Sequence, residues 1–293
     1  MTESMGKKSK TSVILLLNLS VMLFGLSSVI GKFVEASPVM VAWGRVVTSV
    51  IILFFIMKFK KEDFTLEGKK DIMLAILGGV ILAVHWTTFF QSVQVASVAI
   101  GTITFSTFPL FLIFLEPIIF KEKFQKKNLL YVVIILIGVI ITIPEFSTKN
   151  TMTVGIIWGM ISSLSYALLT LINRSLSSRY KGIKISIYEQ AAAAIVLLPV
   201  MLLTYKQPTL TDIIGISAIG IFCTAIGYSL FVSAQRYVTA QQAGIFSSME
   251  TVYGILFAFI FLKDFPTIRE IIGGLIILGV AVYSSLESKG QDA

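Results

Sequence analysis

The sequence has few of the residues on which metalloenzymes, disulfide-linked domains and soluble proteins depend. Its 293 residues include one cysteine, Cys223, and one histidine, His85. A single cysteine excludes an internal disulfide, and no H-E-x-x-H or other Cys/His spacing of a metal site is present. Charged residues make up 14% of the chain, against about 25% in soluble domains. The sequence therefore predicts no metal site and no cofactor, and it argues against an enzyme.

What the sequence has instead is long apolar runs. Residues Ile72 to Leu115 are 44 consecutive positions without Asp, Glu, Lys or Arg. Because one membrane helix needs about 20 residues, this run must fold into two. The runs are continuously apolar and do not alternate, which favours helices over a transmembrane barrel. The mean hydropathy of +0.89 agrees with a chain whose surface faces lipid.

Ten runs are long enough to be expected as spans. The first is preceded by lysines, as in a signal peptide, but no small-x-small cleavage site follows it, so we expect it to be retained. The expected domains are a first half, 12–144, and a second half, 151–286, flanked by cytoplasmic tails at 1–11 and 287–293. The expected spans are 12–31, 38–57, 72–94, 97–120, 129–143, 152–173, 185–204, 213–235, 240–262 and 271–286.

The second half repeats the first at an offset of 141 residues. Each half holds five spans, and because five is odd, the second half must enter the membrane from the opposite side. The predicted fold is therefore an all-α integral membrane protein of ten transmembrane helices in two inverted five-helix repeats, the build of a secondary transporter. Matching pairs include Phe90 and Phe231, Ser92 and Ser233, Gln94 and Gln235, Phe105 and Phe246, and Gly138 and Gly279.

Lysine and arginine counts predict the orientation. With the N-terminus in the cytoplasm, cytoplasmic segments hold 18 basic residues and outer segments hold five, with Arg45 inside a span. This bias predicts a multi-pass protein of the cytoplasmic membrane with both termini inside. The net charge of +8 arises mostly in these loops, so the expected partner is the lipid bilayer and not nucleic acid.

Several short motifs carry a family resemblance. Span 4 contains Ser-Thr-Phe-Pro at 106–109 and ends in Phe-Lys-Glu-Lys at 120–123, with counterparts at 247–250 and 263–265, and His-Trp at 85–86 precedes Phe-Phe-Gln at 89–91. The chain resembles the drug/metabolite transporter superfamily, of the ten-span EamA type. The resemblance implies a cavity lined by the first, third and fourth spans of each half, and substrates among amino acids, other metabolites and toxic cations. A Pro often follows the acidic residue that aligns with Glu250, whereas this chain has Thr251.

Two ionisable residues lie deep enough to be candidates for substrate binding or coupling. Glu250 lies about ten residues into its span, or about 15 Å, which is the midplane. A carboxylate there must be protonated, paired or facing water, so it either carries protons or cations, binds a substrate amine, or is structural. His85 lies at similar depth and either exchanges protons or links two helices as a neutral imidazole.

Arg45, Trp86 and Phe90 are candidates for direct substrate contact. Arg45 lies about seven residues, or about 10 Å, inside span 2, and we interpret it as snorkelling outward, with attraction of a substrate carboxylate as the other interpretation. Trp86 and Phe90 lie one helical turn apart, with Phe89 beside them, and either stack on an aromatic or cationic substrate or pack against neighbours.

Other polar residues are weaker candidates. Glu116 and Glu189 lie near span ends, and we interpret them as interface anchors or local partners of Lys121 and Lys184. Gly155 and Gly159 indicate close helix packing. Uncharged residues that either line a wet face or join helices are Asn18, Thr104, Ser106, Ser162, Tyr166, Asn173, Tyr228 and Ser229.

The function expected from these features is a secondary transporter. It moves a small metabolite, an amino acid or a similar compound, by alternating access, and export is the favoured direction. Protons are a candidate coupling ion. An exporter of toxic cationic compounds is the main alternative, and a polytopic membrane enzyme is an alternative from another class. The sequence leaves open whether the protein is a monomer or a homodimer.

Overall fold

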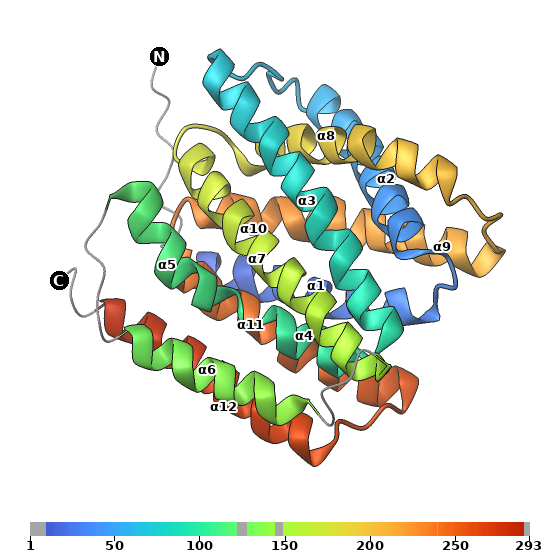
Figure 1. Ribbon diagram of the computed structural model, residues 1–293. Coiled ribbons are helices and arrows are strands. Elements are labelled where there is room, and N and C mark those ends of the chain that lie inside the picture. The colour runs from blue at the N-terminus through green and yellow to red at the C-terminus, as the bar shows by residue number, and fades with distance from the viewer. Residues whose placement is uncertain (1–9, 122–127, 144–148, 239, 290–293) are drawn as a thin grey trace.

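The computed structural model describes residues 10–121, 128–143, 149–238 and 240–289, and the described part is helical (Figure 1). The predicted N-terminal tail lies largely outside it, as do Lys123, Lys126 and Lys127. The helices of the first half are α1 (Lys10–Phe33), α2 (Pro38–Phe59), α3 (Lys69–Val95), α4 (Val98–Phe105), α5 (Phe108–Phe120) and α6 (Asn128–Thr142). Those of the second half are α7 (Thr151–Ser177), α8 (Gly182–Leu203), α9 (Leu210–Ala218), η1 (Ile219–Tyr228), α10 (Ser229–Gln235), α11 (Ala240–Phe257), η2 (Ala258–Leu262) and α12 (Ile268–Lys289).

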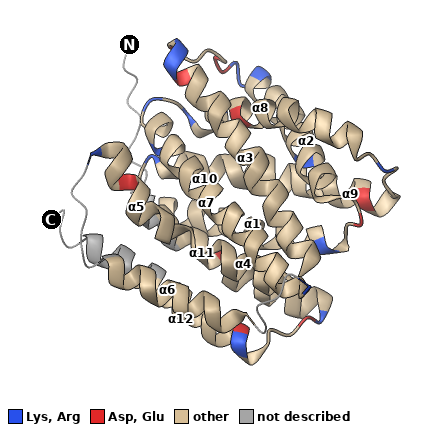
Figure 2. Cartoon of the chain, in the orientation of Figure 1, with Lys and Arg blue, Asp and Glu red and all other residues tan. Residues whose placement is uncertain are grey.

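Seven helical segments of the described chain are long and apolar enough to cross a membrane. They are α1, α2, α3, α4 with α5, α7, α8, and α9 through α10. Two shorter apolar helices cover Leu129–Thr142 and Phe246–Leu262. The protein is thus an all-helical, multi-pass membrane protein, while ten crossings remain a prediction. Charged side chains gather toward the two ends of the helices, with a largely uncharged body between them (Figure 2).

Polar residues begin several helices where the sequence leaves the apolar runs. The Ser37 side chain accepts from the N–H of Met40 at 3.3 Å, and Pro38 occupies the first turn, where its missing N–H costs nothing. Ser97 caps α4 in the same way. These caps supply acceptors for the free N–H groups of the first turn, so helix starts follow from local sequence.

The predicted fourth span is not one continuous helix. It breaks after Phe105 and resumes at Phe108. Pro109 has no N–H to donate to the carbonyl of Phe105, which explains the interruption. The Thr107 hydroxyl instead bonds to the carbonyl of Thr104 at 2.7 Å and lies 2.9 Å from the hydroxyl of Ser163 in α7. The corresponding part of α11, with Thr251 where the family often has Pro, continues as helix.

The eighth predicted span contains a π-helical segment, η1, that the sequence analysis did not predict. The Thr224 hydroxyl donates to the carbonyl of Ile219, five residues back, at 2.9 Å. A π-helical turn adds a residue per turn and re-aims side chains, often at functional sites. Here it turns Thr224 towards α2.

The two halves interlock through the third segment of each, which is α3 in the first half and α9 through α10 in the second. α3 packs between α7 and α8 of the second half, and the segment from α9 to α10 packs against α1 and α2 of the first half. α6 and α12 pack together at one edge of the bundle (Figure 1). Each half therefore packs one of its segments against two helices of the other half.

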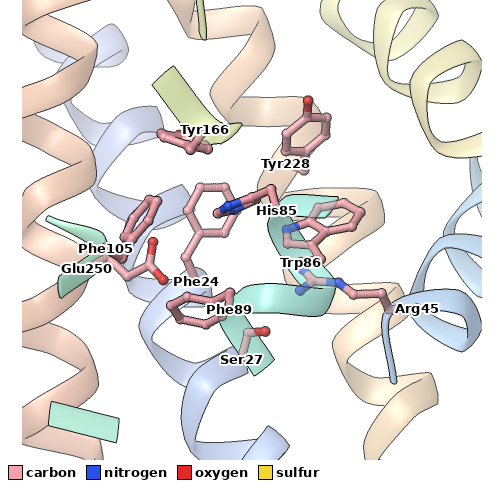
Figure 3. A pocket seen from close by; sticks show the side chains of 10 residues that line it. All are labelled: Phe24, Ser27, Arg45, His85, Trp86, Phe89, Phe105, Tyr166, Tyr228 and Glu250. Atoms are coloured by element: carbon pink, nitrogen blue, oxygen red, sulfur yellow. The ribbon is translucent and has the colours of Figure 1, made fainter. Parts of the chain in front are cut away.

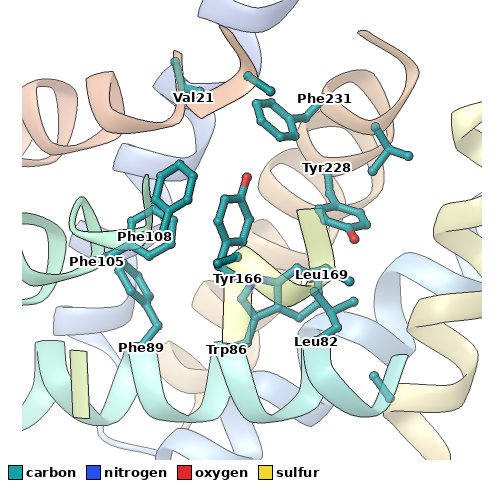
Figure 4. Packing of buried hydrophobic residues seen from close by; sticks show 14 of the residues in the cluster. Val21, Leu82, Trp86, Phe89, Phe105, Phe108, Tyr166, Leu169, Tyr228 and Phe231 are labelled. Carbon is teal, nitrogen blue, oxygen red and sulfur yellow. The ribbon is translucent and has the colours of Figure 1, made fainter. Parts of the chain in front are cut away.

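Small residues allow the close approaches, as predicted for Gly155 and Gly159. A Cβ on Gly155 would lie 2.5 Å from the Cβ of Ala96, and one on Gly159 would lie 2.7 Å from the Cβ of Thr104. Such contacts drive helix association where lipid removes the hydrophobic gain. Aromatic side chains from both halves, among them Phe105, Tyr166 and Phe231, fill the centre of the bundle (Figure 4).

Candidate functional site

A small cavity lies at the centre of the bundle, between the two halves. Ten side chains line it: Phe24, Ser27, Arg45, His85, Trp86, Phe89, Phe105, Tyr166, Tyr228 and Glu250. They come from α1, α2, α3, α4, α7, η1 and α11. Its volume is about 30 Å³, which holds about two waters at 10–15 Å³ each. The side chains therefore close around a space smaller than a metabolite, and substrate access requires the helices to move.

The structure brings together seven of the candidate residues named from the sequence. Glu250 and Arg45 lie at opposite sides of the cavity, with aromatic rings between them (Figure 3). The cavity thus combines one acidic group, one basic group and a largely aromatic wall. The seven residues are Arg45, His85, Trp86, Phe89, Tyr166, Tyr228 and Glu250.

Arg45 does not snorkel outward, and that interpretation was wrong. Its residue is 2% exposed. Its Nε donates to Thr224 Oγ1 at 2.9 Å, and its guanidinium carbon lies 4.0 Å from the centre of the Trp86 ring. The π-helical turn that aims Thr224 at α2 and the cation–π contact hold the head group inward. Its Nη groups form no hydrogen bond within the described residues, which leaves them available to a ligand.

Glu250 is buried, with 6% of its surface exposed, and it borders the cavity. Its carboxylate accepts no hydrogen bond and forms no ion pair among the residues that the structure describes. A buried charge without partners is costly, so this group needs a proton, a cation or water from the cavity. That is the environment expected of a carboxylate that binds and releases a proton or a cationic ligand.

His85 links two helices, which is one of the two interpretations made from the sequence, while proton exchange stays a prediction. Its Nδ1 lies 2.8 Å from the hydroxyl and 3.1 Å from the carbonyl oxygen of Ser162, so it links α3 to α7. Its ring also lines the cavity and packs 5.0 Å from the ring of Tyr166. The Tyr166 hydroxyl lies 3.1 Å from the hydroxyl of Ser247.

Several predicted residues lie away from the cavity lining, among them Phe90, Ser106 and Asn18. Phe90 is fully buried and packs against Gly31, with Arg45 5.4 Å above its ring. Ser106 is fully buried and bonds to Thr251, whose hydroxyl reaches the carbonyl of Thr102. Asn18 is half-buried and donates to the carbonyl of its own helix at Ile14, 2.9 Å away.

Both acids near span ends have partners other than those predicted. Glu189 is fully buried and accepts from the Tyr228 hydroxyl at 2.7 Å, while Lys184 pairs with Asp63. Glu116 forms its ion pair with Arg174 of α7 and not with Lys121. Partners on neighbouring helices replaced partners along the chain, because a side chain near a span end faces inward as readily as outward.

Sequence reasoning missed three lining residues: Phe24, Ser27 and Phe105. Ser20 and Ser27 are seven residues apart and both are buried, and that spacing puts them on one helix face. This serine face was the signal that marks the inner side of α1. Phe24 and Phe105 carry no such signal within their apolar runs. No group of three or more His, Cys, Asp or Glu side chains suited to a metal lies in the part of the chain described.

Comparison with known proteins gives the family. The EamA-like transporter family matches the chain over residues 11–143 and again over 153–286. The chain belongs to this family. An uncharacterized transporter of Archaeoglobus fulgidus is 25% identical over 89% of this chain and 91% of its own length. One of Helicobacter pylori strain J99 is 28% identical over 91% of each chain.

Three further similar proteins carry a substrate name or a solved fold. An S-adenosylmethionine uptake transporter of Rickettsia conorii is 23% identical over 80% of this chain and 78% of its own length. A protein of the same name from Rickettsia bellii is 22% identical over 80% of this chain and 79% of its own length. A crystal structure of a protein 12% identical in sequence superposes with a TM-score of 0.70 over 97% of this chain and 100% of its own. At that identity the likeness shows the fold alone. The EamA-like membership makes this chain a membrane transporter.

Proposed function

We propose that this EamA-like chain carries a small zwitterionic metabolite, an amino acid or similar compound, across the cytoplasmic membrane by alternating access. The observation that carries the proposal is that Arg45 and Glu250 lie on opposite sides of one aromatic cavity. The Nη groups of Arg45 suit a substrate carboxylate, and Glu250 with the aromatic wall suits an ammonium group. Glu250 is also the group proposed to exchange protons when the ammonium leaves.

The ten crossings and the inverted halves are part of this proposal. The double family match and the reciprocal packing of the third segments support them. Reporter fusions after Lys127 and Lys184 are expected to read cytoplasmic, and those near Lys149 and Lys206 external. A cytoplasmic reading at Lys149 would end the inverted-repeat account.

Counterflow into proteoliposomes tests the substrate class. Labelled amino acids are expected to exchange against themselves, with weaker competition from analogues that lack either the carboxylate or the amine. Export is the expected direction, whereas two relatives are named uptake transporters. The labelled amino acid is therefore placed inside the proteoliposomes in one experiment and outside in the other. Equal competition by all three kinds of compound would contradict a zwitterion site.

Export of toxic cations is the second candidate, favoured by the aromatic wall beside Glu250. The Arg45→Gln variant separates the two. For a zwitterion, losing the guanidinium is expected to raise KM about tenfold or more, since a hydrogen bond to a charged group contributes about 1.5–3 kcal/mol. For a cation, the same change leaves KM unchanged or lowers it.

A further inference from the structure

Two buried aspartates occupy equivalent positions in the two halves. Asp71 and Asp212 are 141 residues apart, the offset of the repeat. Each is the third residue of the helix that opens the third segment of its half, α3 or α9, and each is 3% exposed. The two helices begin at opposite ends of the bundle (Figure 1). The repeat therefore places one buried acid at each end of the protein.

Asp71 holds the connection between α7 and α8, which belongs to the other half. Its Oδ2 accepts from Arg179 Nη1 and from the Tyr180 hydroxyl, both at 2.6 Å. The Tyr180 hydroxyl in turn accepts from the N–H of Glu67 at 2.9 Å. Burial and the hydrogen bond to Asp71 raise the pKa of Tyr180, so its hydroxyl stays a donor at physiological pH.

Asp212 does the same at the opposite end, in the reverse direction. Its Oδ1 accepts from the N–H of Glu35 at 2.8 Å and from that of Ala36 at 3.1 Å, in the connection between α1 and α2. Its Oδ2 accepts from the N–H and hydroxyl of Thr209 in a capping box. A second-half acid thus holds a first-half loop, as a first-half acid holds a second-half loop.

We propose that Asp71 and Asp212 are the two gate residues of the transport cycle, each closing one end of the central cavity by binding the loop of the opposite half. The central cavity has a volume of only about 30 Å³ while both contacts are made, which is too small for a metabolite. Since alternating access is itself proposed above, the gates rest on that function.

The chemistry of these contacts suits a reversible gate. An aspartate at the end of a helix bundle that loses its protein donors meets water as the end opens, and water replaces the lost hydrogen bonds at small net cost. An apolar contact offers no such replacement. The gates also differ, since Asp71 uses an ion pair with a half-exposed arginine side chain and Asp212 uses backbone N–H groups. Salt is therefore expected to weaken the Asp71 gate more.

The test measures access to the cavity from each side. Ser27→Cys in a Cys223→Ala background places one thiol in the cavity lining, and a membrane-impermeant maleimide is added to one face of proteoliposomes at a time. Asp71→Asn is expected to increase labelling from the face that carries Lys69 and to decrease it from the other. Asp212→Asn is expected to do the reverse. For each variant, the ratio of the labelling rates from the two faces is expected to shift about tenfold, the change that corresponds to 1.4 kcal/mol.

Matched controls separate gating from general loosening. Lys181→Gln breaks an exposed ion pair with Glu62 at the Asp71 end and is expected to leave both ratios unchanged. Thr209→Ala removes the capping box from Asp212 but not the bonds to Glu35 and Ala36, and it too is expected to leave them unchanged.

Further variants keep the gates testable if an aspartate variant does not fold. Arg179→Gln removes the other partner of Asp71 and is expected to shift labelling as Asp71→Asn does. A Cβ on Gly215 would lie 2.7 Å from Val34 Cγ2. A disulfide between Val34→Cys and Gly215→Cys, formed on oxidation, is therefore expected to abolish labelling from the Asp212 end alone.

Labelling needs no substrate, so its outcome is independent of the transport assay. Shifts in the same direction for both aspartate variants, or none for either, would overturn the gates even in a protein that transports. Reciprocal shifts in a protein that shows no saturable transport would overturn the proposed function and leave the gates standing.

Discussion

Glu250 and Glu189 are both buried acids in the second half, yet their surroundings differ in kind. Glu250 borders the cavity and accepts no hydrogen bond within the described chain. Glu189 is fully buried and accepts from the Tyr228 hydroxyl, which itself accepts from Asn173 Nδ2 at 3.0 Å. Tyr228 separates the two sites, with its ring on the cavity and its hydroxyl on Glu189.

Burial is common to both acids, so the expectation of function rests on their hydrogen-bond partners and on contact with the cavity. Glu189 Oε2 is held by the Tyr228 hydroxyl of η1, which is itself held by Asn173 of α7. Its Oε1 has no hydrogen-bond partner among the described residues and faces Gly78 of α3, where a Cβ would lie 2.5 Å away. Fixed donors stabilise one state of a buried group and resist change. Glu250 has no such donors, so a ligand or proton that reaches the cavity can stabilise it. We therefore expect function at Glu250 and stability at Glu189.

The largest expected effect is on transport by Glu250→Gln. The variant keeps the shape of the side chain but cannot titrate, so transport driven by a pH gradient is expected to fall to the background of empty liposomes. Exchange or binding is retained, with a lower affinity because the ammonium group loses its carboxylate partner. Glu250→Asp is expected to keep partial activity because it keeps the acid. Normal gradient-driven uptake by the glutamine variant would make Glu250 structural and move the coupling role to His85.

Leucine at the two sites gives the next largest contrast, now in stability. Glu189→Leu leaves the Tyr228 hydroxyl without its acceptor and is expected to destabilise the protein by about 2–3 kcal/mol. Glu250→Leu removes an unpartnered buried carboxylate and is expected to leave the melting temperature in detergent unchanged or higher. Equal loss at both sites would erase the distinction drawn here.

Tyr228→Phe tests the residue between the two acids. The ring stays on the cavity, while Glu189 and Asn173 lose their shared partner, so we expect a loss of about 1–2 kcal/mol in stability with substrate KM within about twofold. Tyr166→Phe, which keeps a ring at the same cavity, is the matched control. A large rise in KM for Tyr228→Phe alone would show that its hydroxyl acts on substrate.

The smallest effect is expected at Glu116, an acid near a helix end. Its ion pair with Arg174 involves an arginine side chain that is 37% exposed, and such pairs contribute about 1 kcal/mol or less. Glu116→Gln is therefore expected to lower the melting temperature much less than Glu189→Leu and to leave transport rates unchanged. A loss as large as that of Glu189→Leu would place Glu116 among the buried structural acids.

The depth of a residue along its helix was predictable, and its direction was not. Counting residues from the span ends placed Glu250 deep, and the structure has it buried at the central cavity. The same counting gave Arg45 a depth from which it could reach either way, and the choice of the outer surface was wrong. The contacts that hold Arg45 inward come from Thr224 and Trp86, on two other helices, and no pattern along α2 reports them.

What the sequence determined is the set of helices. Residue hydropathy and chain length decide which runs are apolar enough for a bilayer, and the expected starts and ends agree with the observed helices within about four residues, apart from the break at Ser106 and Thr107. Apart from α1, whose buried Ser20 and Ser27 mark one face, tertiary structure alone decided which face of a helix points inward. In lipid both faces of a span are apolar, so the sequence lacks the polar-against-apolar pattern that marks the buried side of a soluble helix. The partners of Arg45, Glu189 and Asp71 follow from helix packing, because side chains far apart in the chain meet only when the two halves interlock.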